Sequence, residues 1–403
     1  MSAVESTEFL VVGCGPAGAT AAREAAAAGV ETVVLERDAV VGAKRVCAAG
    51  LRPGFCNTFD LPREIVHCDT PRLALFDAQG GEHEIFLGPG HTTTREELDG
   101  TMARLAQAAG AQVRTQALLR GIERNGDRTV VEYADLAGGV RRTISARNVF
   151  LAVGATARLD SSAFGRLAWD RWREGLLTTL QYRVYLERPA AAVAYQTLEL
   201  HYYQGRDGRQ IIAWMFPKRD HLAIGLGVMG KMAGAPLRAE LDEFTEKTRA
   251  RLYPGIAVRS VKVEGHLLYG GMPRPTVSDG NVMVGGTAAG LVDATNGEGI
   301  YEAAMSGRFA ADAVHRGRGK KTIARYGEQI QKRFARRLAH RVRLMGYLEK
   351  HPSRYSLLFQ QLAKTPRLAE VMLKEDYERT VSDRLYIYQE ALRFGLRTVA
   401  CRE

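Results

Sequence analysis

The stretch FLVVGCGPAG, residues 9–18, decides the fold of this chain. Its first four residues are apolar, which favours a buried strand of a parallel sheet. Gly13, Gly15 and Gly18 follow with the spacing G-x-G-x-x-G, and residues 17–28 have the alanine-rich composition of a helix. In the dinucleotide-binding pattern the first glycine allows a tight turn, the second lets a diphosphate approach the backbone, and the third lets helix and strand pack closely.

A second predicted strand supports this interpretation. Residues 31–35 are mostly apolar and are followed by Glu36, 18 residues beyond Gly18. An acidic residue at this place can accept a hydrogen bond from a ribose hydroxyl group. The diphosphate would meet free N–H groups at the start of the predicted helix, near Pro16 and Ala17. We therefore expect the first part of the chain to bind a dinucleotide.

The composition is that of a globular protein. The 403 residues are enough for two or three domains, and the apolar content of 46% and charged content of 25% are ordinary. No run of 18 apolar residues occurs, so we expect no membrane-spanning helix. The beginning, MSAVESTEF, does not have the regions of a secretion signal. Five cysteines without a C-x-x-C pair predict a reducing, cytoplasmic environment, and no His or Cys spacing predicts a metal site.

A second G-x-G-x-x-G occurs at Gly225, Gly227 and Gly230. It would be a nicotinamide-binding site if a helix began there and an acidic residue ended the next strand. The following residues, MGKMAG, are a poor helix start, and no such acid stands at the right distance. We interpret these glycines as relieving crowding at the end of a strand.

Several motifs together make the chain resemble the geranylgeranyl reductases, a family of FAD-dependent enzymes in the p-hydroxybenzoate-hydroxylase-like flavoprotein superfamily. The resemblance covers roughly residues 8–315. Besides GCGPAG and Glu36, it depends on Cys47-Ala48-Ala49-Gly50, Trp214-Met215-Phe216-Pro217-Lys218 and Gly297-Glu298-Gly299-Ile300. A weaker likeness in residues 375–388 is to the chlorophyll-type reductases.

The resemblance implies an α/β (α+β) fold in three parts: a Rossmann-like FAD-binding domain, an antiparallel-sheet substrate domain and a C-terminal helical region. We expect the FAD-binding domain over residues 1–160 and 273–318, with 60–90 contributing to the substrate side. The substrate domain would cover residues 161–272, where aromatic and β-branched strands surround a helix at 236–252. Residues 319–403 would be helical.

The resemblance also implies the chemistry. Reduced FAD would deliver hydride to a C=C bond of a prenyl chain, with NADPH or reduced ferredoxin as the electron donor. Cys47 would supply a proton or gate the site, although a small buried thiol is an equal alternative. Trp214 and Phe216 would form an apolar wall or simply sheet core. The cofactor-binding residues expected are Gly13, Gly15, Pro16, Ala17, Gly18, Glu36, Arg37, Arg45, Cys47, Ala48, Arg95, Gly154, Gly286, Gly290, Gly297, Gly299 and Ile300.

Three departures from the family pattern leave alternatives open. Gly286 stands where the superfamily usually has Asp, Val153 replaces the Asp of an Asp-Gly pair, and Ile212 replaces a Tyr. Loss of both carboxylates favours a degenerate flavoprotein with a non-catalytic role as one alternative. The other is a flavin-dependent monooxygenase or halogenase, although halogenases tend to carry W-x-W-x-I-P and this chain has W-M-F-P.

The net charge of +11 is concentrated in one segment. Between Arg316 and Arg343 there are eleven Lys or Arg residues and one acid, Glu328. Apolar residues recur there at helical spacing, at Ile330, Phe334, Leu338, Val342 and Met345. Such a basic amphipathic helix fits peripheral contact with an anionic membrane over residues 320–345, or a solvated helix packed on the FAD-binding domain. No nucleic-acid-binding module accompanies the charge, so we expect no nucleic-acid partner.

Overall fold

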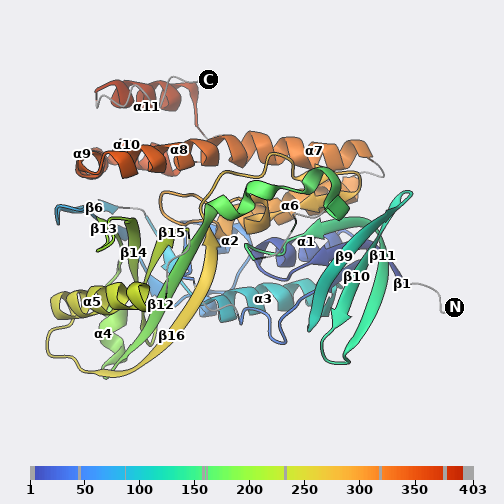
Figure 1. Cartoon of the computed structure of the whole chain (residues 1–403), viewed down its shortest axis with the longest axis horizontal. Helices are drawn as coiled ribbons and strands as arrows, with labels where there is room; N and C mark the ends of the chain where they lie inside the picture. The colour runs from blue at the N-terminus through green and yellow to red at the C-terminus, as the bar shows by residue number, and fades with distance from the viewer. Residues whose placement is uncertain are drawn as a thin grey trace.

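The computed structural model describes residues 5–43, 47–86, 88–156, 159, 162–230, 234–316, 320–374 and 379–393. Two large sheets lie side by side, and a layer of helices from the end of the chain covers them (Figure 1). This is the predicted class: a Rossmann-like part, an antiparallel-sheet part and a C-terminal helical region.

The first sheet contains the dinucleotide-binding pattern. Its central strands β18, β11, β1, β2 and β8 are parallel in this order, and β9 and β10 extend β11 as an antiparallel layer. The strands of this sheet are β1 (Glu5–Val12), β2 (Thr32–Leu35), β8 (Gln112–Arg114), β9 (Ala117–Asn125), β10 (Arg128–Asp135), β11 (Val140–Leu151), β17 (Ser278–Asp279) and β18 (Val282–Val284).

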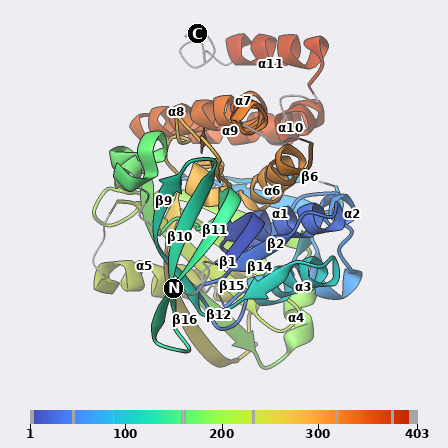
Figure 2. The same ribbon diagram turned by 90° about the vertical axis from the view of Figure 1, so that its right-hand side faces the viewer.

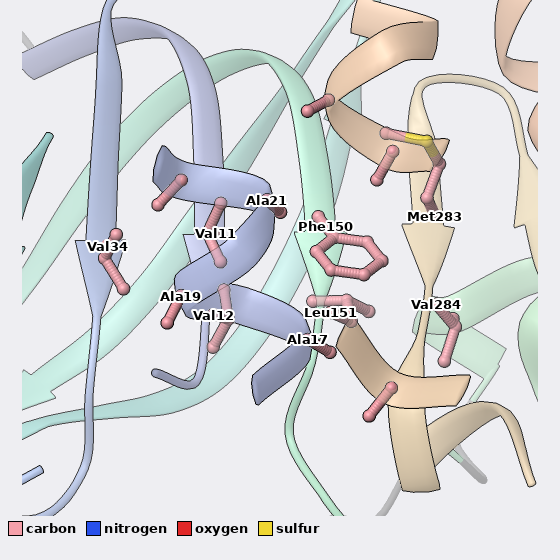
Figure 3. Packing of buried hydrophobic residues seen from close by; sticks show 14 of the residues in the cluster. Val11, Val12, Ala17, Ala19, Ala21, Val34, Phe150, Leu151, Met283 and Val284 are labelled. Atoms are coloured by element: carbon pink, nitrogen blue, oxygen red, sulfur yellow. The ribbon is translucent and has the colours of Figure 1, made fainter. Parts of the chain in front are cut away.

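Helices α1 (Pro16–Ala27) and α6 (Ile300–Arg316) pack together on this sheet. Figure 3 shows Val11 beside the small residues of α1 and the Phe150 ring on the side of Met283. The helices approach closely because Gly307 of α6 lies against the backbone of Ala17, where an added Cβ atom would be 2.1 Å from the carbonyl oxygen. Helix α3 (Arg95–Ala108) covers the other side of α1, and Thr94 caps it as a hydrogen-bond acceptor from Glu97 N.

The second sheet has the order β16-β12-β15-β14-β13-β5-β6. The hairpin β5–β6 joins it because β5 pairs in parallel with β13. The long edge strand β16 has no counterpart in the sequence prediction, since its alternating charged residues do not look apolar. The strands are β5 (Arg72–Phe76), β6 (Glu82–Phe86), β12 (Leu176–Leu186), β13 (Thr197–Gln204), β14 (Gln210–Pro217), β15 (Leu222–Met229) and β16 (Val258–Tyr269).

The two faces of this sheet have different partners. Helix α5 (Gly234–Leu252) covers one face, with Leu237, Leu241 and Phe244 in its apolar cluster. On the opposite face, Leu200 and Trp214 belong to an apolar cluster that also contains Met345 and Phe359 of the C-terminal helices. These helices lie above the sheets in Figure 2. The remaining short elements are β3 (Gly50–Leu51), β4 (Cys68–Asp69), β7 (His91–Thr92), α2 (Phe55–Thr58), α4 (Pro189–Ala194), and the 3-10 turns Arg63–Ile65, Ser162–Leu167, Asp170–Gly175 and Gly286–Ala289.

The C-terminal layer distinguishes between the two environments expected for the basic helix. Ile330, Phe334 and Leu338 are fully buried in the core of the FAD-binding part, and Met345 is buried against the second sheet. Four of the five apolar residues of the predicted stripe are therefore covered by protein, and Val342 is half-buried. This agrees with the predicted alternative of a helix packed on the protein. The layer consists of α7 (Lys320–Ile330), a π-helical turn (Gln331–Ala335), α8 (Arg336–Lys350), α9 (Ser353–Lys364), α10 (Pro366–Leu373) and α11 (Val381–Arg393). Across the described residues, no helix has both the length and the hydropathy needed to cross a membrane.

Candidate active site

A cavity of about 310 Å³ lies where the two large sheets meet. One end is formed by the loop after β1, by Ala152 and Gly154 after β11, and by the turn 292–300 before α6. The carboxyl ends of parallel strands are the usual ligand site of such sheets. The other end is formed by apolar side chains of the second sheet, among them Leu198, Leu200, Ile212, Trp214 and Phe216.

The diphosphate end has the predicted geometry. Gly13 has φ +96°, and an added Cβ atom would lie 2.4 Å from the carbonyl oxygen of Ala152. At Gly18 the added atom would lie 1.8 Å from the carbonyl oxygen of Gly13. No side chain caps α1, which begins at Pro16 after Gly15. The first-turn N–H groups thus have room and no competing acceptor, which fits the diphosphate of FAD.

Glu36 holds the loop that the diphosphate would contact. One carboxylate oxygen accepts a hydrogen bond from Cys14 N at 2.7 Å, and the other accepts one from Asp38 N at 2.9 Å. A ribose hydroxyl would share this half-buried carboxylate with the backbone. Arg37 is exposed, pairs with Asp38 and does not line the cavity. Arg45 lies outside the described residues.

Arg95 is a buried cation at the diphosphate end. Its guanidinium pairs with Asp99 at 2.6 and 2.8 Å, and its Nη2 would lie 3.4 Å from a Cβ atom placed on Gly15. Burial alone would lower the pKa of Arg95, but the Asp99 carboxylate and the Cys47 sulfur beside it raise the pKa. Only 11% of the Arg95 side chain is exposed, so this cation is not a solvated surface residue.

The turn before α6 is built as predicted at Gly297, Gly299 and Ile300, all of which line the cavity. Gly297 has φ +76°, and an added Cβ atom on Gly299 would lie 3.0 Å from the carbonyl oxygen of Leu291. Gly290 does not line the cavity, because its positive φ closes the preceding 3-10 turn.

Gly286 and Gly154 line the cavity with φ of +57° and +74°. An added Cβ atom on Gly286 would lie 3.1 Å from the Cβ atom of Ala17. The missing carboxylate of the family pattern would therefore stand at the start of α1. Val153, the other departure, is not among the lining residues.

Glu298 forms an ion pair that the sequence did not predict. Its carboxylate accepts a hydrogen bond from Arg52 Nε at 2.6 Å, and Arg52 also approaches Glu302 at 3.4 Å. Arg52 follows the Cys47 loop in the chain, while Glu298 belongs to the turn before α6. The pair thus connects two loops on opposite sides of the cavity.

Trp214 and Phe216 form the predicted apolar wall. Both lie on the cavity face of β14 and are less than 10% exposed. The indole lies on Gly225 of β15, where an added Cβ atom would be 2.3 Å from the ring, and its Nε1 donates to Gln181 Oε1 at 2.9 Å. The second glycine motif is therefore strand, and its first glycine makes room for Trp214.

A buried lysine, Lys218, forms hydrogen bonds with the backbone of the Cys47 loop. Cys47 is half-buried and lines the cavity with Ala48, and Ala49 adopts φ +47°. The Nζ atom of Lys218 donates hydrogen bonds to the carbonyl oxygens of Ala48 and, at 3.5 Å, Ala49. Burial lowers the pKa of Lys218 to about 7. The motif ending in Lys218 was recognised from the sequence, but its contact with the Cys47 loop needs the tertiary structure.

Relatives with curated names are similar to much of the chain. The geranylgeranyl diphosphate reductase of Synechocystis sp. is 30% identical over 316 residues, covering 75% of this chain and 74% of that protein. Digeranylgeranylglycerophospholipid reductase 1 of Methanopyrus kandleri is 30% identical over 317 residues, covering 76% of this chain and 80% of that protein. The chloroplastic geranylgeranyl diphosphate reductase of Oryza sativa subsp. japonica is 31% identical, and the chain spans 65% of its length. No protein-family model matches.

Solved structures share the fold. A geranylgeranyl bacteriochlorophyll reductase-like protein from Thermoplasma acidophilum has a TM-score of 0.72 at 20% identity, covering 97% of this chain and all of that one. A p-nitrophenol 4-monooxygenase from Pseudomonas putida has a TM-score of 0.69 at 17% identity, covering 90% of this chain and 94% of that one. At such identities the likeness concerns the fold alone.

Proposed function

Because the chain belongs to the geranylgeranyl reductase family of FAD-dependent oxidoreductases, we propose that it reduces carbon–carbon double bonds in a geranylgeranyl or related prenyl chain. The chain would be attached to a lipid, a quinone or a tetrapyrrole alcohol. One observation carries the proposal: the diphosphate-binding end and the apolar end belong to one continuous cavity. Bound FAD, once reduced, would supply the hydride.

The apolar end suits a flexible hydrocarbon. Leu198, Leu200 and Ile212 line it beside Trp214 and Phe216, and polar contacts there are few. The Trp214 indole is held by its hydrogen bond to Gln181 and by its seat on Gly225, so the wall is rigid. A rigid apolar wall orients a prenyl chain and keeps water from the reacting bond.

The proposed acid is Cys47. Reduction of an alkene needs a proton at one carbon as well as a hydride at the other. Cys47 lines the cavity on a loop that Lys218 holds from behind, so its thiol can face a bound chain. Glu298 is less suited because its carboxylate is engaged by Arg52.

The electron donor would be NADPH or reduced ferredoxin. The second glycine motif supplies no nicotinamide site, because Gly225 and Gly227 lie within strand β15. A donor would therefore reach the flavin without a second Rossmann-type site in this motif.

Contact with a membrane surface would depend on electrostatic attraction between exposed basic side chains and anionic lipids. Lys332, Arg336 and Arg343 are exposed, whereas the apolar stripe between them is buried. We expect binding to anionic vesicles at low salt that is lost in 0.5 M salt, because charges separated by solvent are then screened. Binding that survives high salt in co-sedimentation would contradict this, since it would require apolar insertion.

Product analysis tests the proposed function. The protein is loaded with FAD, reduced with dithionite under nitrogen and incubated with geranylgeranyl diphosphate. We expect products heavier by two hydrogen atoms for each bond reduced, identified by mass spectrometry. A protein that binds FAD but leaves the prenyl chain unchanged, and consumes oxygen with added NADPH, would favour the monooxygenase alternative. A protein that cannot be loaded with FAD would favour the non-catalytic alternative.

A further inference from the structure

A lysine without an acidic partner is buried behind the cavity wall. Lys218 is 1% exposed, and among the described residues no carboxylate forms an ion pair with it. Within the described ranges, the hydrogen bonds of its Nζ atom go to the carbonyl oxygens of Ala48 and Ala49. Burying an ammonium group costs free energy when no carboxylate pairs with it. We therefore expect a role of Lys218 in the function of the site rather than in the stability of the fold.

A second, small cavity connects Lys218 with the active site. Its volume is about 10 Å³, roughly the space of one water molecule. Lys218, Gln181 and Arg183 line it, and both Cys47 and Arg95 line this cavity as well as the large one. Cys47 and Arg95 therefore lie between the large cavity and a polar compartment that contains Lys218. Of these two residues, only Cys47 can give up a proton and take it back near neutral pH.

We propose that Lys218 is the proton reservoir of Cys47 and returns a proton to the thiolate after each reduction. This inference rests on the proposed function. When the prenyl chain is reduced, the S–H bond of Cys47 breaks and a C–H bond forms at the carbon that does not receive hydride. An N–H bond of Lys218 then breaks as the S–H bond re-forms, and the neutral amine takes a proton from water. Lys218 does not line the large cavity, so it acts through Cys47.

The surroundings of Lys218 suit this exchange. Burial lowers its pKa to about 7, while Cys47, Cys68 and Glu96 favour the charged form and Arg183 opposes it. The other titratable groups beside it are Arg95, His67 and His221, and the pKa of His221 is lowered to about 4, chiefly by burial. Both forms of Lys218 are therefore populated near neutral pH, whereas the neighbouring histidine His221 is neutral there.

Alkylation of Cys47 tests the contact without requiring activity. In FAD-free protein, iodoacetamide labelling at Cys47 is followed by peptide mass spectrometry from pH 6 to pH 9. Loss of the ammonium charge in Lys218→Met is expected to slow labelling several-fold at pH 6.5 and much less at pH 9, where Lys218 is already neutral. Lys247→Met, at an exposed lysine that pairs with Glu243, should match the wild type. Identical profiles for Lys218→Met and the wild type would overturn the proposal.

Successive turnovers test the relay itself. Lys218→Arg keeps a cation and hydrogen-bond donors, but a guanidinium does not release a proton near neutral pH. We expect a normal first turnover with geranylgeranyl diphosphate and at least about tenfold slower later turnovers. Equal rates throughout, or equal slowing of all turnovers, would overturn the relay. If the wild type reduces no prenyl chain, the proposed function itself fails, while the labelling result still reports whether Lys218 acts on Cys47.

Discussion

Arg337 of the C-terminal helix α8 contacts the carboxylate of Glu302 in α6 at 2.7 Å, and Glu302 is fully buried. Arg341, one turn further along α8, approaches Asp293 in the turn before α6 at 3.4 Å. Arg52 reaches Glu302 from the Cys47 side. The C-terminal helices are thus tied by buried charges to both loops that border the cofactor end of the cavity.

Arg337→Met should therefore destabilise the protein strongly. Removing one partner of a buried ion pair typically lowers the free energy of unfolding by about 3–5 kcal/mol, because a buried charge loses its compensation. Urea unfolding measures the change. The matched control is Arg171→Met, whose pair with Glu174 is exposed and should change stability by less than about 1 kcal/mol. Equal effects of both variants would mean that the Arg337 contact is not formed.

Gly225→Ala tests the packing of the Trp214 indole against Gly225. The new methyl group would lie 2.3 Å from the indole, so the ring must move. Such overpacking typically lowers stability by about 1–3 kcal/mol, and the displaced ring should also weaken prenyl binding. Gly121→Ala is the control, because Gly121 also lies in a strand and has open space around its Cα atom. An unchanged tryptophan fluorescence spectrum and unchanged stability in Gly225→Ala would contradict the described packing.

Gly286→Asp and Gly286→Ala together test the missing carboxylate. Both variants add a Cβ atom 3.1 Å from that of Ala17 at a residue with φ +57°, so both crowd Ala17 to the same extent. Asp tolerates this backbone better than Ala does. We expect Gly286→Asp to bind FAD more tightly than Gly286→Ala, measured by fluorescence titration. Equal affinities would mean that a carboxylate at this place does not contact the cofactor.

Lys218 should make stability depend on pH. Burial lowers its pKa from 10.5 to about 7, so the unfolded chain binds more protons than the folded one between these values. The free energy of unfolding of the wild type, measured relative to Lys218→Met, should therefore rise from about pH 7 toward pH 10 and stay flat below pH 7. Urea titrations of both proteins at several pH values check this. A constant difference between them would show that folding does not lower the pKa of Lys218.

The structure of the Rossmann-like part could be predicted because its glycines are required by contacts that lie close to them in the chain or in the sheet. Gly13 and Gly18 are required by contacts within about 30 residues of chain or with the adjoining strand, so their spacing alone fixes strand, turn and helix. Glu36 and the turn at 297–300 could also be recognised from short stretches of sequence. The sequence leaves Trp214 and Phe216 either on an apolar pocket wall or in the sheet core, and in the structure both line the cavity.

The rest depended on contacts between distant segments. The stripe at Ile330, Phe334 and Leu338 has the same periodicity whether protein or lipid covers it, so the sequence could not choose between these partners. Lys218 and the Cys47 loop are about 170 residues apart, and their hydrogen bond leaves no local signal. Strand β16 alternates charged residues at a sheet edge, which hides it from patterns based on apolar residues.

Anaerobic reoxidation of the reduced, FAD-loaded protein tests the central claim most directly. The flavin is bleached with a stoichiometric amount of dithionite, and geranylgeranyl diphosphate is then added without oxygen while the flavin absorbance is followed. We predict that the oxidised flavin spectrum returns on adding the prenyl compound, and that a saturated analogue has no effect. A flavin that stays reduced until oxygen is admitted would contradict the account.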